Sequence, residues 1–347
     1  MEITKSKFLI KDGKDIYRYT IKNSNNMEVK ILTLGGIITD IILPDKDGKR
    51  ENVALKYKND EDFFINEGYM GALIGRFCGR IPNGKVTINS KEYKLYQNDN
   101  TNTLHGGKDG LDKKIWNHKS YIEDNKGILE LTYKSKDMEE GFPGNLDIKV
   151  IYSLDNDNNL SIIYEGISDE DTIFNMSNHV YLNLSGECKE KITSHKLYLN
   201  SYGVLEVDEV QAATGKVLSL ENTPFDFTKE KLIGQDMIKE NESVLTAGGY
   251  DHCFLLNNGE NPKAILHHEK SGRGVEVYTD TPALVVYTKN FLENREMAIG
   301  REDEQRDTIC LETQNCPIGI NGEFTDQSII KANVKYKTET TFRFFVK

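Results

Sequence analysis

Apolar and polar residues alternate with a period of two along much of this chain. In residues 148–154 every second position is apolar, with Ile148, Val150, Tyr152 and Leu154. A run of Asp and Asn follows at 155–159, and the alternation resumes with Leu160, Ile162 and Tyr164. Because successive side chains of a β-strand point to opposite faces, this pattern predicts two strands joined by a turn.

The same pattern predicts strands elsewhere. Residues 86–95 read as a hairpin folded at Asn89 and Ser90, and Val275 and Val277 read as one arm of a hairpin with residues 284–287. The C-terminal residues 334–345 alternate as well. An isolated strand leaves its backbone groups unpaired, so we expect this last strand to join a sheet.

Helical signals are few. Residues 59–62 can cap one short helix before Phe63, and residues 229–239 can form another. Strands that are not separated by regular helices argue against a parallel sheet. The sequence therefore predicts an all-β protein, a large antiparallel β-sandwich with few short helices. Residues 1–347 show no linker, low-complexity block or repeat, which favours a single domain, although the length leaves two domains open.

Composition narrows the class of protein. The chain has 347 residues, of which 37% are hydrophobic and 29% charged, enough to bury a core. Its net charge of −11 repels phosphate backbones and anionic lipid, so we expect neither nucleic acid nor membrane as a partner. No apolar run is long enough to span a bilayer and no secretion signal is recognisable, which indicates a cytoplasmic protein. The five cysteines are odd in number, irregularly spaced and without a C-x-x-C pair, so we expect free thiols.

Four segments combine histidine or acid with turn or strand residues. The first is His105 followed by two glycines, where the backbone can turn sharply and leave the imidazole open to a cleft. An ordinary turn with a surface histidine is the alternative.

In the second segment, residues 175–184, alternation gathers polar groups on one strand face: Asn175, Ser177, His179, Tyr181 and Asn183. Such a face suits a hydroxyl-rich ligand, and three asparagines are unusual in a purely structural strand.

The other two segments carry acids. Glu312 follows the β-rich run 307–311, and an acid at the end of a buried strand would have a raised pKa, useful for a general base. An exposed glutamate is the alternative. Asp251 stands beside His252 between a glycine turn and an apolar run, where it can bind sugar hydroxyls or cap the turn.

Other catalytic patterns are absent from the sequence. It contains no G-x-S-x-G, no glycine-rich phosphate loop and no H-E-x-x-H. His267 and His268 are adjacent in a predicted strand, so their side chains face opposite ways and cannot readily bind one metal ion. We therefore expect no metal and no cofactor.

Seven short motifs occur in the order typical of one family. They lie at residues 74–81, 104–107, 140–146, 178–184, 223–227, 250–252 and 311–314. With them the chain resembles the aldose 1-epimerases from about Leu34 to its C-terminus. The resemblance implies a large antiparallel β-sandwich in a single domain. It also implies an isomerase that interconverts the α and β anomers of a free aldohexose such as galactose or glucose, without metal or cofactor, as a monomer or a dimer.

The resemblance also implies residue roles. Glu312 is similar to the family's catalytic base and His179 to its catalytic acid, while Arg76, His105 and Asp251 should bind sugar hydroxyls, with His105 near the ring oxygen. The base would take the proton of the C1 hydroxyl while the acid protonates the ring oxygen, which opens the ring.

Two positions depart from the family pattern. Gly79 stands where many relatives carry Asn, which removes one contact to the substrate, and Ile318 stands where many carry Asp, at what we expect to be the rim of the site. Two alternative functions remain. A hexose-6-phosphate mutarotase would need a cationic phosphate site, and a sugar-binding protein without turnover would need no acid–base pair.

Overall fold

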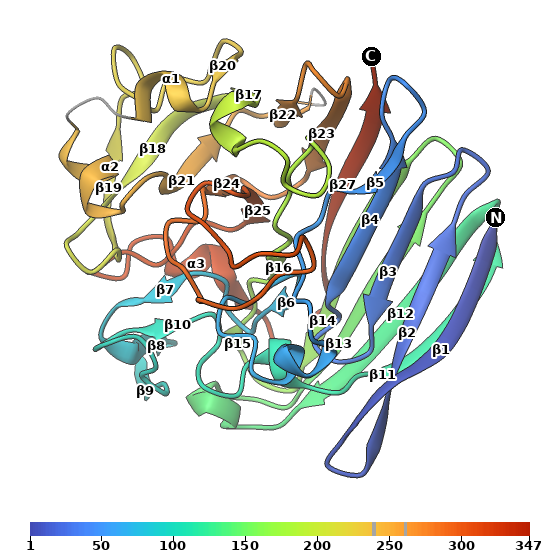
Figure 1. Ribbon diagram of the computed structural model, residues 1–347. Helices are drawn as coiled ribbons and strands as arrows, with labels where there is room; N and C mark the ends of the chain where they lie inside the picture. The colour runs from blue at the N-terminus through green and yellow to red at the C-terminus, as the bar shows by residue number, and fades with distance from the viewer. Residues whose placement is uncertain (238–240, 260–261) are drawn as a thin grey trace.

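Three antiparallel sheets dominate the computed structural model, which describes residues 1–237, 241–259 and 262–347 (Figure 1). The first sheet consists, in spatial order, of β1 (Glu2–Lys11), β2 (Lys14–Lys22), β3 (Glu28–Leu32), β4 (Ile38–Pro44) and β5 (Arg50–Asn52). The second consists of β11 (Asn117–Glu123), β12 (Lys126–Ser135), β13 (Leu146–Leu154), β14 (Asn159–Ser168), β27 (Tyr336–Val346), β23 (Arg273–Thr279), β22 (Ala264–His267), β17 (Lys196–Leu199) and β20 (Lys231–Leu232). The third consists of β19 (Ala213–Leu218), β18 (Ser201–Val207), β21 (Asp251–Leu256), β24 (Ala283–Tyr287) and β25 (Cys310–Gln314).

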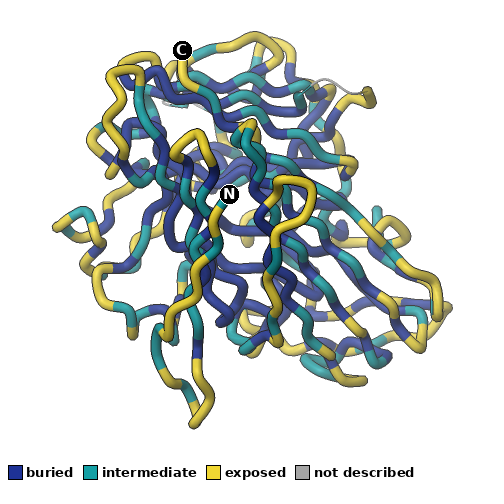
Figure 2. Tube along the Cα trace, turned by 90° about the vertical axis from the view of Figure 1, so that its right-hand side faces the viewer, coloured by how far each residue is buried: buried dark blue, intermediate teal, exposed yellow. Residues whose placement is uncertain are grey.

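The nine-stranded sheet is the layer on which the two five-stranded sheets pack. Apolar residues of β2 and β3, such as Ile21 and Ile31, share one buried cluster with Leu131 of β12 and Val150 of β13. The same cluster continues under the third sheet. Figure 2 shows buried residues running through the interior strands, with exposed residues gathered in the loops. The predicted large antiparallel sandwich is therefore confirmed.

Local alternation predicted the hairpins well. β13 pairs with β14 across the Asp/Asn turn, and β8 (Lys85–Ile88) pairs with β9 (Lys91–Lys94) across Asn89 and Ser90. The C-terminal strand β27 lies between β14 and β23, so it is fully paired, as expected. The hairpin expected from residues 275–287 is wrong, because β23 pairs with β22 and β27 whereas β24 pairs with β21 and β25 in another sheet.

The helices are short. The α-helices are α1 (Gly234–Met237), α2 (Glu242–Thr246) and α3 (Thr325–Ser328), and the 3₁₀ turns are η1 (Asp60–Phe64), η2 (Pro82–Gly84), η3 (Leu111–Lys113), η4 (Glu139–Gly141) and η5 (Ile192–Ser194). The helix expected at 59–64 is η1. The helix expected over 229–239 is partly wrong, since residues 231–232 form β20, and residues 238–239 lie outside the described part of the chain. Within the described residues, no helix is both long and apolar enough to cross a bilayer.

The described residues also form four separate two-stranded pairs. They are β6 (Leu73–Ile74) with β16 (Ser177–Asn178), β7 (Arg80–Ile81) with β10 (Thr103–Leu104), β8 with β9, and β15 (Thr172–Ile173) with β26 (Ile329–Ile330). In the third sheet the alternation separates two faces. Phe254 and Val286 point into the core, whereas Asp251, Val285 and Glu312 point to a cavity between this sheet and the loops around β6, β7 and β10.

Candidate active site

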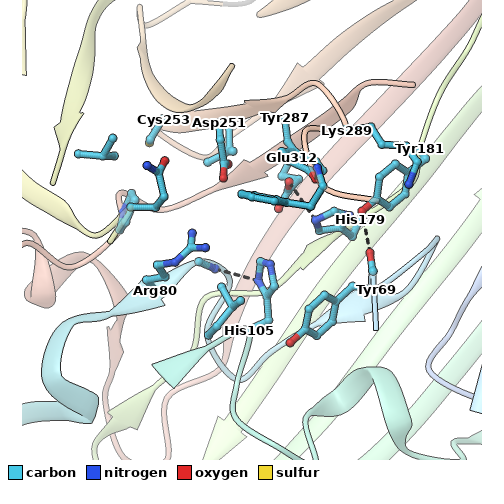
Figure 3. Close-up of a pocket in the computed structure, with 18 of the residues that line it drawn as sticks. Tyr69, Arg80, His105, His179, Tyr181, Asp251, Cys253, Tyr287, Lys289 and Glu312 are labelled. Atoms are coloured by element: carbon cyan, nitrogen blue, oxygen red, sulfur yellow. Dashed lines mark hydrogen bonds and ion pairs between the residues drawn. The ribbon is translucent and has the colours of Figure 1, made fainter. Parts of the chain in front are cut away.

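A cavity of about 440 Å³ lies against the free face of the third sheet. Four of the five site residues expected from the sequence line it, namely His105, His179, Asp251 and Glu312. Figure 3 shows Asp251, Tyr287 and Glu312 reaching in from the sheet side, with Arg80, His105 and Tyr69 on the opposite side. Residues far apart in the sequence therefore converge on one space large enough for a monosaccharide.

Glu312 is a buried acid in the middle of β25. The sequence had indicated a position at the end of a strand. Its side chain is almost fully enclosed, and its Oε1 lies 3.5 Å from Nε2 of His179. On the other oxygen, Oε2, it accepts a hydrogen bond from the Cys78 thiol at 3.3 Å. Burial, together with the negative charge of Asp251, raises the pKa of Glu312 to about 8. A carboxyl with such a pKa exchanges its proton readily near neutral pH.

His179 is held by its own backbone. Its N–H donates to the carbonyl of Ala72 at 2.9 Å, and its carbonyl accepts from Gly71 at 3.0 Å. The imidazole Nδ1 lies 3.5 Å from Sγ of Cys310. Burial, together with the nearby positive charge of Lys289, lowers the pKa of His179 to about 4. Both shifts favour the same state of the pair at neutral pH, in which it holds one proton on Glu312 and the imidazole of His179 is neutral.

The segment around His179 is not the regular strand that was expected. Within residues 175–184 only Ser177 and Asn178 form a strand, and the whole of residues 172–186 is buried, because the segment passes between the sheets. The asparagines are structural. Asn175 accepts from the backbone N–H of Asn315, and Asn183 donates to backbone carbonyls. The expected polar face for a ligand is therefore reduced to His179 and Tyr181, which do line the cavity.

His105 is a neutral hydrogen-bond donor. Its φ of 53° lies in the left-handed region, and the following glycines let the chain turn there. The backbone N–H of Gly79 donates to Nδ1 at 3.2 Å, which leaves the proton of the neutral ring on Nε2. Burial holds the pKa of His105 well below its ordinary value, so the ring stays neutral. The ring packs edge-on against Tyr69, with centroids 4.6 Å apart.

The same geometry bears on metal binding. Single donor atoms of His105, His179 and Glu312 lie within 4.8 Å of one another, and two histidines with a glutamate form a zinc ligand set. Neither nitrogen of His105 is free, however, since Nδ1 accepts from Gly79 and Nε2 carries the proton. Metal binding would have to break the Gly79 contact and strip that proton, so the arrangement favours proton transfer and hydrogen bonding.

Arg76 does not line the cavity, contrary to expectation. Its buried guanidinium donates to the carbonyls of Ser135, Lys136, Pro143 and Gly144 at 2.8–3.1 Å. Burial lowers the pKa of Arg76 to about 10. The arginine at the cavity is Arg80, four residues later. Arg76 is thus held by backbone carbonyls of residues 135–144, whereas Arg80 lines the cavity.

Arg80 and Asp251 are opposite charges on the cavity wall. Nε of Arg80 forms an ion pair with Oδ2 of Asp99 at 2.7 Å. Burial raises the pKa of Asp251, and the charge of Arg80 partly offsets that rise. Both side chains offer polar atoms to the space beside Glu312.

Sequence reasoning missed several residues of the wall, including Tyr69, Tyr287, Lys289 and Gln314. Lys289 is almost fully buried and pairs with Asp303 at 2.8 Å. Gln314 is two positions from Glu312, so alternation along β25 was a usable signal. The loop residues Tyr69 and Lys289 carry no periodic signal.

Both departures from the family pattern can now be placed. Gly79 lines the cavity with a φ of 90°, and a Cβ there would meet Nε2 of Gln314 at 3.7 Å. Ile318 is buried in an apolar cluster with Phe77 and Ile81 and does not line the cavity, so its expected place at the rim is wrong. All five cysteines are buried free thiols, as expected.

Known proteins share this fold and sequence. A solved galactose 1-epimerase from Lactobacillus acidophilus NCFM has a TM-score of 0.89 at 32% identity, covering 99% of both chains. A galactose mutarotase of Bos taurus is 33% identical over 326 residues, 93% of this chain and 92% of the relative. An aldose 1-epimerase of Haemophilus influenzae is 34% identical over 337 residues, 96% of this chain and 97% of the relative.

These likenesses first define the class, which is that of galactose mutarotase-like β-sandwiches. The family model described as aldose 1-epimerase matches residues 17–343, and the chain belongs to the aldose 1-epimerase family. It is an isomerase with the activity of a mutarotase.

Proposed function

We propose that the cavity opens and recloses the ring of free aldohexoses such as galactose and glucose, with Glu312 as base and His179 as acid. The observation that carries the proposal is the 3.5 Å approach of these two buried side chains on the cavity wall. His105, Arg80 and Asp251 bind the sugar hydroxyls, with Arg80 in the place first expected for Arg76.

The chemistry needs one proton shared by two groups. For ring opening, the carboxylate of Glu312 takes the C1 hydroxyl proton while the imidazolium of His179 protonates the ring oxygen, so neither a free alkoxide nor an oxocarbenium ion forms. After rotation about the C1–C2 bond the roles reverse and the other anomer closes. The open-chain sugar thus coexists with protonated Glu312 and neutral His179, the state that burial favours. Sugar hydroxyls donating to Glu312 stabilise its carboxylate and favour the form that opens the ring.

A hexose-6-phosphate substrate fits the cavity less well. Among the described residues lining it, the cations are Arg80 and Lys289, and each is already paired with a carboxylate. No cationic group of the described wall is therefore left to neutralise a phosphate dianion.

Polarimetry tests the proposal. Freshly dissolved α-D-galactose and α-D-glucose should approach equilibrium rotation faster with the protein, with no metal or nucleotide added. Acceleration restricted to the 6-phosphates would establish the phosphate-specific alternative. Saturable sugar binding with no acceleration would establish the binding protein.

Three broader assignments accompany the proposal. A single domain is supported by the family match over residues 17–343. A cytoplasmic location is supported by the five free thiols, which a reducing compartment maintains. The net charge of −11 supports a small neutral sugar, rather than nucleic acid or anionic lipid, as the partner.

A further inference from the structure

A carboxamide without a hydrogen-bond partner forms part of the cavity wall. The Gln314 side chain is 0% exposed, yet among the described residues neither its Oε1 nor its Nε2 has a partner. The residue nevertheless lines the cavity. Buried amides are nearly always hydrogen-bonded in native proteins, since an unpaired buried polar group costs free energy. A ligand that pairs with this amide when it enters the cavity accounts for its position.

The position of Gln314 relative to the acid–base pair follows from strand geometry. Glu312 and Gln314 lie on the same face of β25, because successive side chains alternate, and their Cβ atoms are separated by about 7 Å. Thr313 between them points the other way, and its Oγ1 lies within hydrogen-bond distance of Oγ1 of Thr340. This separation is similar to the distance across a pyranose ring from the C1 oxygen to the hydroxyls on C3 and C4.

Gly79 keeps one side of the amide free. A Cβ at that position would lie 3.7 Å from Nε2 of Gln314 and 3.9 Å from Pro317, and a longer side chain would extend from there into the cavity. The glycine thus adds no side chain beside Nε2 at this part of the cavity wall.

We propose that Gln314 is a specificity-determining residue that binds two neighbouring hydroxyls on the side of the sugar ring opposite C1, those on C3 and C4. The inference rests on the proposed function above. A carboxamide offers one acceptor and two donors, and two vicinal hydroxyls offer the complementary donor and acceptor. Glu312 then acts at the reacting end of the sugar while Gln314 fixes its far end.

The test compares the wild-type protein with Gln314→Met, which keeps the length of the side chain and removes the amide. Thr313→Val is the matched control, since it alters the same strand on its other face. The kcat/KM for mutarotation is measured by polarimetry on D-glucose and on its 2-deoxy, 3-deoxy and 4-deoxy analogues. The 2-deoxy sugar is the substrate control, because C2 adjoins the reacting carbon.

For the wild-type protein and Thr313→Val, we expect kcat/KM to fall about 10- to 100-fold on the 3-deoxy or 4-deoxy sugar, since the amide then stays unpaired in a buried site. Gln314→Met should lose a similar factor on glucose and no longer distinguish glucose from those two analogues. The effect of the 2-deoxy change should be equal in all three proteins.

Two results would overturn the inference. One is a wild-type protein that turns over the 3-deoxy and 4-deoxy sugars as well as glucose, a measurement that needs no variant to fold. The other is a Gln314→Met protein that keeps the full wild-type penalty on them. Absence of any glucose turnover by the wild-type protein would instead remove the proposed function, so the two failures are distinguishable.

Discussion

Glu312 and His179 carry opposite pKa shifts with one physical cause. Burial raises the pKa of Glu312 to about 8 and lowers that of His179 to about 4, because enclosure disfavours the charged form of each. The raised pKa of Glu312 agrees with the expectation from its β-rich surroundings in the sequence. Between these values the pair holds one proton, and the two ionisations belong to the pair as a unit.

The pH profile of kcat/KM should therefore be flat from about pH 4 to about pH 8, with the alkaline limb caused by loss of the Glu312 proton. A carboxyl has a small ionisation enthalpy and an imidazole a large one. We expect the alkaline limb to move little when the assay temperature is raised. A strong shift of the alkaline limb with temperature would show that an imidazole, not a carboxyl, causes it.

The Cys78 thiol should affect the pH at which this alkaline limb occurs. It donates to Oε2 of Glu312 and stabilises the carboxylate, so Cys78→Ala should raise the Glu312 pKa and shift the alkaline limb to higher pH. Cys78→Ser retains a donor and should shift it less or in the opposite direction. The measurement is the kcat/KM profile of each variant beside Cys188→Ala, whose thiol is buried in another cluster. Identical profiles for all the variants would show that the thiol does not affect Glu312.

The acid–base assignment itself is tested by Glu312→Gln and His179→Gln. Each keeps a polar group but cannot perform its proton transfer, so kcat should fall roughly 10²–10⁴-fold, with a smaller change in sugar binding. His267→Gln is a suitable control because His267 is partly exposed. His195 would be a poor control, since it is fully buried and its ring accepts a hydrogen bond from the backbone N–H of Leu184. Near wild-type kcat in Glu312→Gln would show that Glu312 is not the base.

Among single residues, the sequence correctly indicated which acids and histidines line the cavity, but it indicated the wrong arginine. Motif resemblance and local pattern selected His105, His179, Asp251 and Glu312, all of which line the cavity. Arg76 was chosen wrongly because the chain around it is irregular, with only two residues in β6 before it and two in β7 after it. In such a segment, the direction of a side chain is set by its tertiary partners.

Among the elements, hairpins were predictable and sheet membership was not. The pairing of β13 with β14 depends on adjacent alternation and a polar turn, both visible in the sequence. The separation of β23 from β24 into different sheets depends on strands distant in the sequence, such as β27 and β25. The same reason explains the buried segment around His179, whose asparagines satisfy backbone groups that belong to other loops.

Arg76 and Arg80 should show different phenotypes because one holds elements together and the other faces the cavity. Arg76→Ala leaves several buried carbonyls of residues 135–144 unpaired, so the free energy of unfolding should fall by at least about 3 kcal/mol. Arg80→Ala should mainly raise KM, since its ion pair with Asp99 is partly exposed and contributes about 1 kcal/mol or less. Urea unfolding and steady-state kinetics on both variants measure the difference. Unchanged stability with a raised KM in Arg76→Ala would contradict this division.

For the whole molecule, burial of neutral acids and bases links stability to pH. Between its ordinary pKa of 4.5 and its folded pKa of about 8, Glu312 binds more proton in the folded than in the unfolded state. Its contribution to the free energy of unfolding therefore decreases as pH rises through that interval. The buried His179 and His252 act oppositely: their lowered pKa values give a contribution that is complete above about pH 6.5 and is lost as the pH falls below it.

Glu312→Gln should accordingly become more stable relative to the wild-type protein as the pH is raised from 4.5 to 8, by about 1 kcal/mol per pH unit. Urea unfolding at several pH values measures this difference. A constant difference between the two proteins over that interval would mean that Glu312 has the same pKa in the folded and unfolded states.

The convergence of distant segments on one cavity also has a consequence for how the protein acquires activity. The wall joins Tyr69 and His105 from one third of the chain, His179 from the middle and Glu312 from near its end. Contacts between positions so far apart form late and slowly, because long loops must close before they are stabilised. A ribosome-bound or partly refolded chain can already contain its local hairpins while lacking any catalytic centre. Regain of activity on refolding therefore reports the last assembly step, not the first appearance of β-structure.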